Sequence, residues 1–371
     1  MKRPGVSITK IEVLFLLLIS YLPSNAQIKV IDSTDRKFIA FAQLIAPDGR
    51  LVGTSDAEGK IDTTLVDRFV SDYDTLVVQH ISYKAQSKSW NDIKHSSFVR
   101  LIPREVVIPE ITVTNKKEKM VLVLEGYFQS YQLKDSIPEY YGDGMVKYFI
   151  WNDGKGFKDQ KDAYRLFRNQ ELISAKDYEK AALTEGGLTI PYIEPKTIIG
   201  QLNKDYVITD SIGQTSILKE DSVVGCIRIN DAQKQVQINI DWIAPAQAIE
   251  KSLLGHESRI THQEVTETYH AGSRSMTSRA NLESWRKYHQ YFYKQKKEKE
   301  YRNIQIVSEF YVLKSYYIPK SAMKAMLSST GWGIPRSHSY TTEYWKEQEK
   351  IIPPLNPNIQ KLLGTKLTMY D

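Results

Sequence analysis

The most constraining feature of this sequence is a succession of short apolar runs, separated by turn signals, between Ile28 and Asn115. Pro47-Asp48-Gly49 and Ser55-Asp56-Ala57-Glu58-Gly59 supply turn residues, and each turn contains a glycine that can adopt positive φ. Leu51–Thr54 and Lys60–Leu65 flank the second turn and should form a hairpin. About seven runs of strand length predict a seven-stranded antiparallel β-sandwich over residues 27–115.

Six short segments of this region carry a family resemblance. The region resembles the carboxypeptidase regulatory-like domain, a transthyretin-like β-sandwich found in envelope proteins of Gram-negative bacteria. The chain departs from the usual pattern at Ile28, Ala40, Ile61 and Ser82, which weakens individual turns but not the strand order. The resemblance implies an accessory module without catalytic residues. The matching segments are Val30-Ile31-Asp32, Ile39-Ala40-Phe41-Ala42-Gln43-Leu44, Gly53-Thr54-Ser55-Asp56-Ala57-Glu58-Gly59, Asp74-Thr75-Leu76, Ile81-Ser82-Tyr83 and Ile111-Thr112-Val113.

Residues 1–26 have the form of a cleaved secretory signal peptide. Basic residues precede an apolar run from Ile11 to Leu22, and Ser24 and Ala26 supply small residues for cleavage. The run is shorter than the roughly 18 residues that a membrane-spanning helix needs, and no later segment is a candidate span. The sole cysteine, Cys226, lies far from the cleavage site, which argues against a lipid anchor. We therefore expect an exported protein, periplasmic or associated with the outer membrane, with no transmembrane segment in the mature chain.

The charge of the chain argues against a nucleic-acid partner. A formal net charge of +6 over 371 residues is a mild excess, and the basic residues are mostly interleaved with acids. An envelope protein or a glycan is the partner class that we expect, and the sequence does not predict an oligomeric state.

The remainder of the chain, residues 116–371, is expected to form an α+β domain behind the charged linker Lys116-Lys117-Glu118-Lys119. Helical spacing of apolar residues predicts helices within Asp159–Thr184 and around Leu282–Phe292. The general plan predicted is a curved antiparallel sheet with helices, in a chain that is mainly β. Strands are predicted at Met145–Trp151, Val223–Asn230, Gln235–Trp242, Arg259–Tyr269 and Asn303–Leu313.

Two histidines near an acid invite comparison with zinc-peptidase motifs, but their spacing is wrong. His256 and His262 are six residues apart, which places their rings about 120° apart around a helix or about 20 Å apart along a strand. His262 and Glu264 would be neighbours on one strand face, about 7 Å apart, and could join a metal site only with a third ligand distant in sequence. Exposed strand polarity is the favoured interpretation, so we predict no metal site and no cofactor, with His262 and Glu264 as the candidate pair.

A second possible motif, Gly154-Lys155-Gly156, lies where a dinucleotide-binding loop would lie. Asp159 occupies the third glycine position, and its carboxylate would repel a pyrophosphate. We interpret Asn152-Asp153-Gly154 as a turn and Asp159 as a residue that starts a helix.

The absence of a catalytic motif makes a non-catalytic exported envelope protein the leading hypothesis. In it, the sandwich is an interaction or spacing module and the second domain binds a protein or a glycan. One alternative is a periplasmic carrier that encloses an apolar ligand in the cavity of its curved sheet. Another is a hydrolase or metallopeptidase, which would need several of His256, His262, Glu264 and His270 to converge in a cleft.

Overall fold

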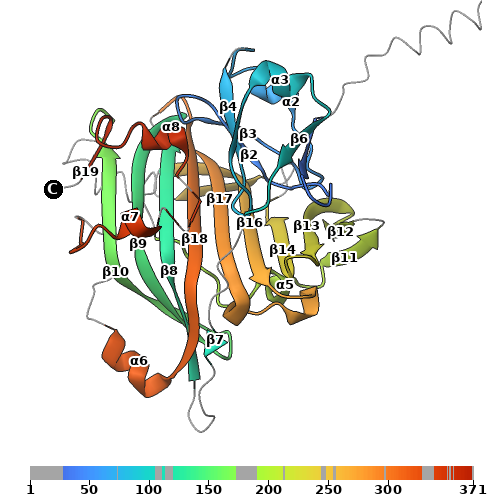
Figure 1. Ribbon diagram of the computed structural model, residues 1–371. Helices are drawn as coiled ribbons and strands as arrows, with labels where there is room; N and C mark the ends of the chain where they lie inside the picture. Colours follow the sequence, from blue (N-terminus) through green and yellow to red (C-terminus); the bar gives the residue numbers. More distant parts are fainter. Residues whose placement is uncertain are drawn as a thin grey trace, which may run out of the picture.

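A computed structural model describes residues 28–369, except for 73, 105–110, 113–119, 173–189, 212–213, 244–247, 254–255, 296–297, 328–337, 349, 351 and 354. The molecule consists of a small β-domain seated on one large antiparallel sheet (Figure 1). The predicted signal peptide and the predicted linker at residues 116–119 lie outside the described residues. No helix within the described ranges is both long enough and apolar enough to span a membrane.

The small domain contains a four-stranded antiparallel sheet in the order β3-β2-β4-β5 and a parallel pair, β1 and β6. Its apolar core surrounds the fully buried Trp90, on the short helix α3 (Trp90–Lys94). The strands are β1 (Lys29–Asp32), β2 (Gln43–Ile45), β3 (Leu51–Thr54), β4 (Thr75–Gln79), β5 (Gln86–Ser89) and β6 (Phe98–Leu101).

Two parts of the predicted seven-stranded antiparallel sandwich are therefore wrong for the described residues. The expected strand Lys60–Leu65 contributes only isolated bridges at Lys60 and Ile61, and the helix α2 (Thr63–Val66) then begins. Asp62 ends the extended stretch because its side chain accepts a hydrogen bond from the Leu65 backbone N–H at 3.1 Å and caps this helix. Of the expected closing strand, Val107–Val113, the structure describes only Ile111 and Thr112, which form β7 (Ile111–Thr112) and pair with the large sheet instead.

Among the described residues, the large sheet has thirteen strands, one of which is β7, and its main path runs β11-β12-β13-β14-β16-β17-β18-β8-β9-β10-β19. Neighbours along this path are antiparallel, whereas β7 pairs with β18 in parallel and β15 pairs with β16 off the path. The strands are β8 (Met120–Lys134), β9 (Ile137–Trp151), β10 (Phe157–Asn169), β11 (Tyr206–Ser211), β12 (Gln214–Lys219), β13 (Ser222–Asn230), β14 (Gln235–Asp241), β15 (Ile249–Leu253), β16 (His256–His270), β17 (Leu282–Gln295), β18 (Arg302–Pro319) and β19 (Leu367–Met369).

This sheet bends so that its two halves share one apolar core. Leu124 on β8 and Tyr148 on β9 belong to the same cluster as Ile227 on β13 and Ile238 on β14. Phe310 on the central strand β18 contacts Tyr148 edge to face, with the ring centroids 4.9 Å apart. The prediction of a large antiparallel sheet is confirmed, and so are the strands at β13, β14, β16 and β18.

Both predicted helices are wrong where the structure describes them. Residues 159–169 belong to β10, and Leu282–Phe292 belongs to β17. A bulge in β10 between Lys161 and Ala163 breaks its two-residue period, and β17 buries the side chains of five consecutive residues, which hides the alternation expected of a strand.

Gly154 takes φ +64° in a turn that joins β9 to β10, so the predicted turn is confirmed, whereas Asp159 starts no helix. The helices that accompany the large sheet are short: α5 (Ile198–Gln201), α6 (Lys320–Met326), α7 (Tyr344–Gln348), α8 (Pro357–Gln360) and the 3₁₀ turns η2 (Arg274–Met276) and η3 (Arg279–Asn281).

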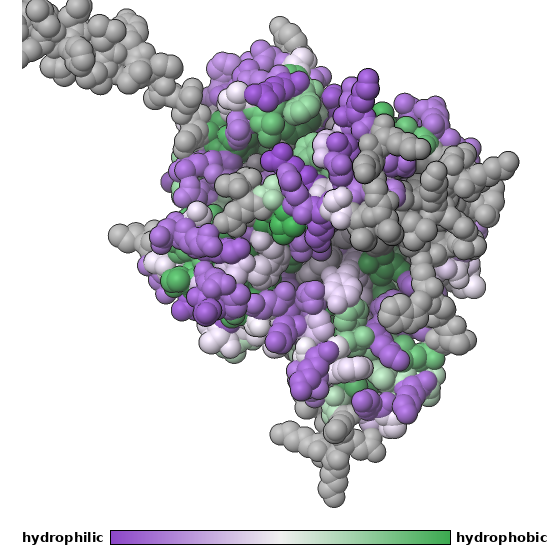
Figure 2. Space-filling view, turned by 180° about the vertical axis from the view of Figure 1, so that it is seen from behind, coloured by the Kyte–Doolittle hydropathy of each residue, from purple (hydrophilic) through white to green (hydrophobic). Residues whose placement is uncertain are grey.

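The small domain packs on the large sheet through both apolar and ionic contacts. Ile45 and Val77 from the small domain join an apolar cluster with Tyr288 and Val307 of the sheet. Beside it, the buried guanidinium of Arg228 on β13 lies 2.5 Å from a carboxylate oxygen of Asp32 on β1. Figure 2 shows hydrophilic and hydrophobic residues interspersed over the coloured part of the back face. These contacts fix the position of the small domain over β13 and β14 of the sheet.

Candidate functional site

The four residues that the hydrolase hypothesis requires all lie on one strand, β16, and they do not converge. His256 is the first residue of β16 and His270 is the last, about 45 Å apart along an extended strand. The ring of His256 stacks on Tyr293, whereas His270 lies 3.5 Å from a carboxylate oxygen of Glu283. Only His262 and Glu264 come together, as their two-residue spacing predicts.

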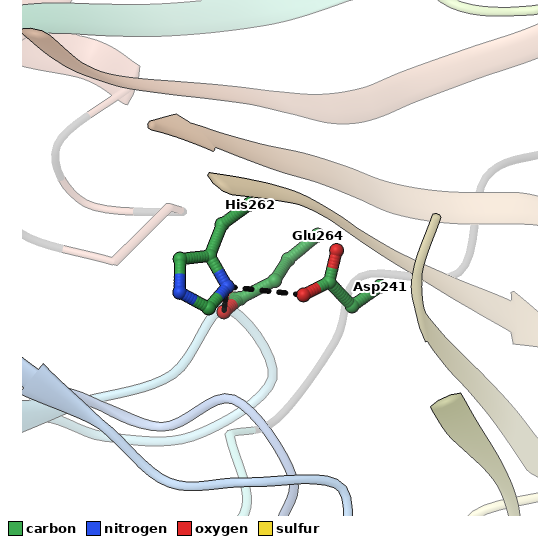
Figure 3. A group of neighbouring side chains, drawn as sticks. All are labelled: Asp241, His262 and Glu264. Carbon is green, nitrogen blue, oxygen red and sulfur yellow. Dashed lines mark hydrogen bonds and ion pairs between the residues drawn. The ribbon is translucent and has the colours of Figure 1, made fainter. Parts of the chain in front are cut away.

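A third residue, Asp241, completes a cluster with this pair (Figure 3). Asp241 is the last residue of β14 and lies directly opposite Glu264 in the antiparallel register of β14 and β16. Nδ1 of His262 is 3.0 Å from Oδ2 of Asp241 and 4.0 Å from Oε1 of Glu264. One potential ligand atom from each residue lies within 4.8 Å of the others. We call Asp241, His262 and Glu264 the triad.

Backbone groups hold the Asp241 carboxylate in place. Its Oδ1 atom accepts hydrogen bonds from the backbone N–H groups of Ile243 and Gln263, each at 3.0 Å. This arrangement leaves Oδ2 facing His262. Both donors are backbone atoms, Gln263 within β16 and Ile243 just after the end of β14, so the orientation of Asp241 follows from the sheet itself.

Glu264 is the most deeply placed member of the triad. It is 4% exposed, and its Oε2 atom has no hydrogen-bond partner among the residues that the structure describes. Two carboxylates opposite each other on neighbouring strands repel when both are charged. Burial and the charge of Asp241 raise the pKa of Glu264 to about 7.

His262 responds to the same surroundings. Burial disfavours its charged form, but the hydrogen bond to Asp241 and the negative charge of Glu264 outweigh burial and raise its pKa. The triad therefore contains one group that can carry positive charge and two that can carry negative charge.

The triad lies in the wall of a pocket of about 590 Å³ between the small domain and the large sheet. Residues 54–57, at the end of β3 and after it, and residues 60–65 line the side of the small domain, and Val223, Val224 and the triad line the side of the sheet. Cavities of roughly 300–1,000 Å³ with a few convergent polar groups are typical of small-molecule sites. Neither part of the molecule forms this pocket alone.

One lining residue, Phe41, has a backbone conformation that is unusual for a bulky side chain. Its φ is +57°, in the left-handed region. Its N–H donates to the Ser55 carbonyl oxygen at 3.0 Å, and its own carbonyl oxygen accepts from Arg286 of the sheet at 3.4 Å. Such strained positions, which cost about 1–3 kcal/mol, tend to lie at functional sites.

Sequence reasoning missed Asp241, and it assigned the wrong environment to Glu264. The polar side chains of β14 alternate with Val236, Ile238 and Ile240, which predicts an exposed polar face. That face is instead buried under the small domain, as the 8% exposure of Asp241 and 1% exposure of Asn239 show. The available signal was the run of amide and acidic residues, Gln237, Asn239 and Asp241, on one face of a strand.

Comparison with known proteins does not assign the chain to a family. The resemblance of the small domain to the carboxypeptidase regulatory-like domain rests on its short sequence segments alone. The chain matches no protein-family model and no curated protein.

Proposed function

We propose that this protein is a non-catalytic exported envelope protein that binds a glycan in the pocket between the small domain and the large sheet. The observation that carries the proposal is the 590 Å³ pocket, whose lining comes from both parts of the molecule. The signal-like residues 1–26 support export to the periplasm or the outer membrane. The small domain, in this account, is an interaction module because it forms one wall of the binding site.

The chemistry of the lining supports a polyhydroxylated ligand. Thr54, Thr63 and Thr64 contribute hydroxyl groups, and Asp56 and Asp62 contribute carboxylates. Hydroxyls both donate and accept hydrogen bonds, and carboxylates accept them, which matches the alternating donors and acceptors of a sugar. The apolar residues Leu65, Val223 and Val224 can face the C–H surfaces of a sugar ring.

The apolar carrier is less well supported than glycan binding. On the concave side of the large sheet, the described side chains pack on one another around Phe310 and Tyr148. A cavity of about 110 Å³ beside this core is lined partly by the charged residues Glu194, Glu267 and Lys287. A small, charged cavity does not suit an apolar chain.

The hydrolase alternative needs several of its candidate residues to meet in one cleft. His256 and His270 cannot do so because they lie at opposite ends of β16.

A glycan array followed by calorimetric titration of the bound glycans tests this proposal. Thr64 is an exposed residue of α2 that lines the pocket, so Thr64→Trp should fill part of the pocket and weaken binding at least about tenfold. Asn91→Trp makes the same kind of change at an exposed position of α3, outside the pocket lining, and should leave affinity unchanged.

Two results would contradict the proposal. One is a bound glycan whose affinity is equal in the wild type and in Thr64→Trp, because the binding site would then lie elsewhere. The other is chromatographic detection of cleaved glycan, because the protein would then be a hydrolase.

A further inference from the structure

The triad has a feature that a purely structural ion-pair cluster would not need. Glu264 is more than nine-tenths buried, lines the pocket, and presents a carboxylate oxygen that no described residue bonds. Leaving such an oxygen unpaired costs on the order of 1–3 kcal/mol, and more when it is charged. An electropositive ligand at this point would remove that cost.

The cations near the triad are already engaged elsewhere. Arg286, whose charge also acts on Glu264 at longer range, forms its ion pair with Glu309, with Nε and Oε1 3.4 Å apart. Lys60, which lines the pocket, pairs with Glu58 at 2.5 Å. Within the triad, only His262 can carry a positive charge, whereas Asp241 and Glu264 can each carry a negative one. A bound cation could therefore neutralise the remaining negative charge.

The distances between the ligand atoms suit a metal ion. Zinc binds imidazole nitrogen and carboxylate oxygen at about 2.0–2.2 Å, which separates two tetrahedral ligand atoms by about 3.3 Å. The observed separations of 3.0 Å from His262 to Asp241 and 4.0 Å from His262 to Glu264 lie on either side of that value. Side-chain shifts of under about 1 Å bring these two pairs to the ideal separation.

We propose that Asp241, His262 and Glu264 form a binding site for Zn²⁺, with the remaining coordination position open to the pocket between the small domain and the large sheet. Three protein ligands and one open position are the arrangement of zinc sites that interact with a further ligand. The backbone N–H groups of Ile243 and Gln263 act as outer supports that orient Asp241.

The donor set favours zinc over the hard alkaline-earth cations. Ca²⁺ and Mg²⁺ prefer sites made entirely of oxygen atoms, whereas an imidazole nitrogen suits Zn²⁺ and its first-row neighbours. Two carboxylates carry a total charge of −2 and a histidine ligand is neutral, so the triad fully neutralises the charge of a bound Zn²⁺. This inference concerns the metal ion alone and does not require that a glycan bind.

Titration of the tag-free, metal-stripped full protein with ZnCl₂ by isothermal calorimetry tests the site. We expect one Zn²⁺ per chain, and at least about tenfold weaker binding in Asp241→Asn, His262→Gln and Glu264→Gln. His256→Gln is the matched control because His256 lies on the same strand outside the triad, and this variant should bind as the wild type does. Circular dichroism establishes that each variant is folded.

Co²⁺ in place of Zn²⁺ supplies a spectroscopic readout. A four- or five-coordinate Co²⁺ absorbs in the visible range, and this absorption should be present in the wild type and absent from the three triad variants. The proposal is overturned if the folded wild type binds no Zn²⁺ at 100-fold molar excess, or if the triad variants bind it as tightly as His256→Gln does. Zinc binding without any glycan binding would leave this site standing and remove the proposed function.

Discussion

At the residue scale, His80 shows how closely the small domain is matched to the sheet. It is 3% exposed, and its Nδ1 atom accepts a hydrogen bond from the backbone N–H of Ser82 at 3.2 Å. The other ring nitrogen lies 2.9 Å from the side-chain amide of Gln237 on β14. Burial lowers the pKa of His80 well below 6.5, and the positive charges of Arg286 and Arg228 lower it further. His80 is therefore neutral in the folded protein.

This environment predicts a loss of stability in acid. Below pH 6.5 the unfolded chain protonates His80 and the folded chain does not, so the contribution of His80 is present above that pH and is lost as pH falls. Between pH 7.5 and pH 5.0 this residue can account for a loss of at most about 2 kcal/mol. Urea unfolding at both pH values should show a smaller loss in His80→Asn.

The control for this experiment is His95→Asn, since His95 is exposed at the end of α3. This variant should keep the acid sensitivity of the wild type. Equal acid sensitivity in the wild type and in His80→Asn would show that His80 does not carry the effect.

At the element scale, the close approach of β8 and β18 depends on a glycine. A Cβ atom at Gly126 would lie 2.1 Å from the carbonyl oxygen of Tyr311 and 2.8 Å from the ring of Phe310. A bulge between Val312 and Lys314 on β18 faces this position. The paired strands β8 and β18 therefore leave no room for a side chain at Gly126.

Gly126→Ala should destabilise the protein by about 1–3 kcal/mol because the added methyl group displaces backbone. Gly272→Ala is the matched control, since no atom lies within 4 Å of a Cβ atom there. Urea unfolding midpoints of both variants measure the effect, and equal midpoints would contradict the packing described for β8.

The strands that could be predicted from the sequence are those with apolar side chains on one face and polar side chains on the other. The hairpin of β13 and β14 was predictable because Val236, Ile238 and Ile240 alternate with polar residues. The strands β10 and β17 were not, because β10 contains a bulge and β17 is buried on both faces over its first five residues. Hydrophobic periodicity reveals a strand only where one face is buried and the other is exposed. The two faces of β10 and β17 differ too little in burial for this.

The same limit applies to the candidate site. A strand period of two residues places His262 beside Glu264, so that pair was predictable. Asp241 lies 21 residues before His262 and joins them through the register of β14 and β16, with β15 between them in the chain. Strand register across such a connection is a property of the assembled sheet, so the complete triad became visible only in the structure.

At the scale of the whole molecule, the pocket exists because the small domain and the large sheet pack as one structural unit. Arg228 on β13 reaches both Asp32 and Asp35 of the small domain, each at 2.5 Å, and also bonds Tyr83. Ser82 and Thr268 add a buried hydrogen bond of 2.9 Å across the same junction. Separation of the two parts would open the pocket and expose the triad.

Unfolding should therefore be cooperative across both parts. Arg228→Ala leaves the buried Asp32 without its ionic partner and should cost about 3–5 kcal/mol, lowering one shared transition. Arg259→Ala removes an exposed arginine on β16 and should have little effect.

Scanning calorimetry of the full protein beside these two variants shows whether the small domain and the large sheet unfold as one unit. We predict a single transition with equal calorimetric and van't Hoff enthalpies, shifted as a whole to lower temperature by Arg228→Ala and not by Arg259→Ala. Two separate transitions in the wild type, one for the small domain and one for the sheet, would contradict the claim that the two parts form one unit around the pocket.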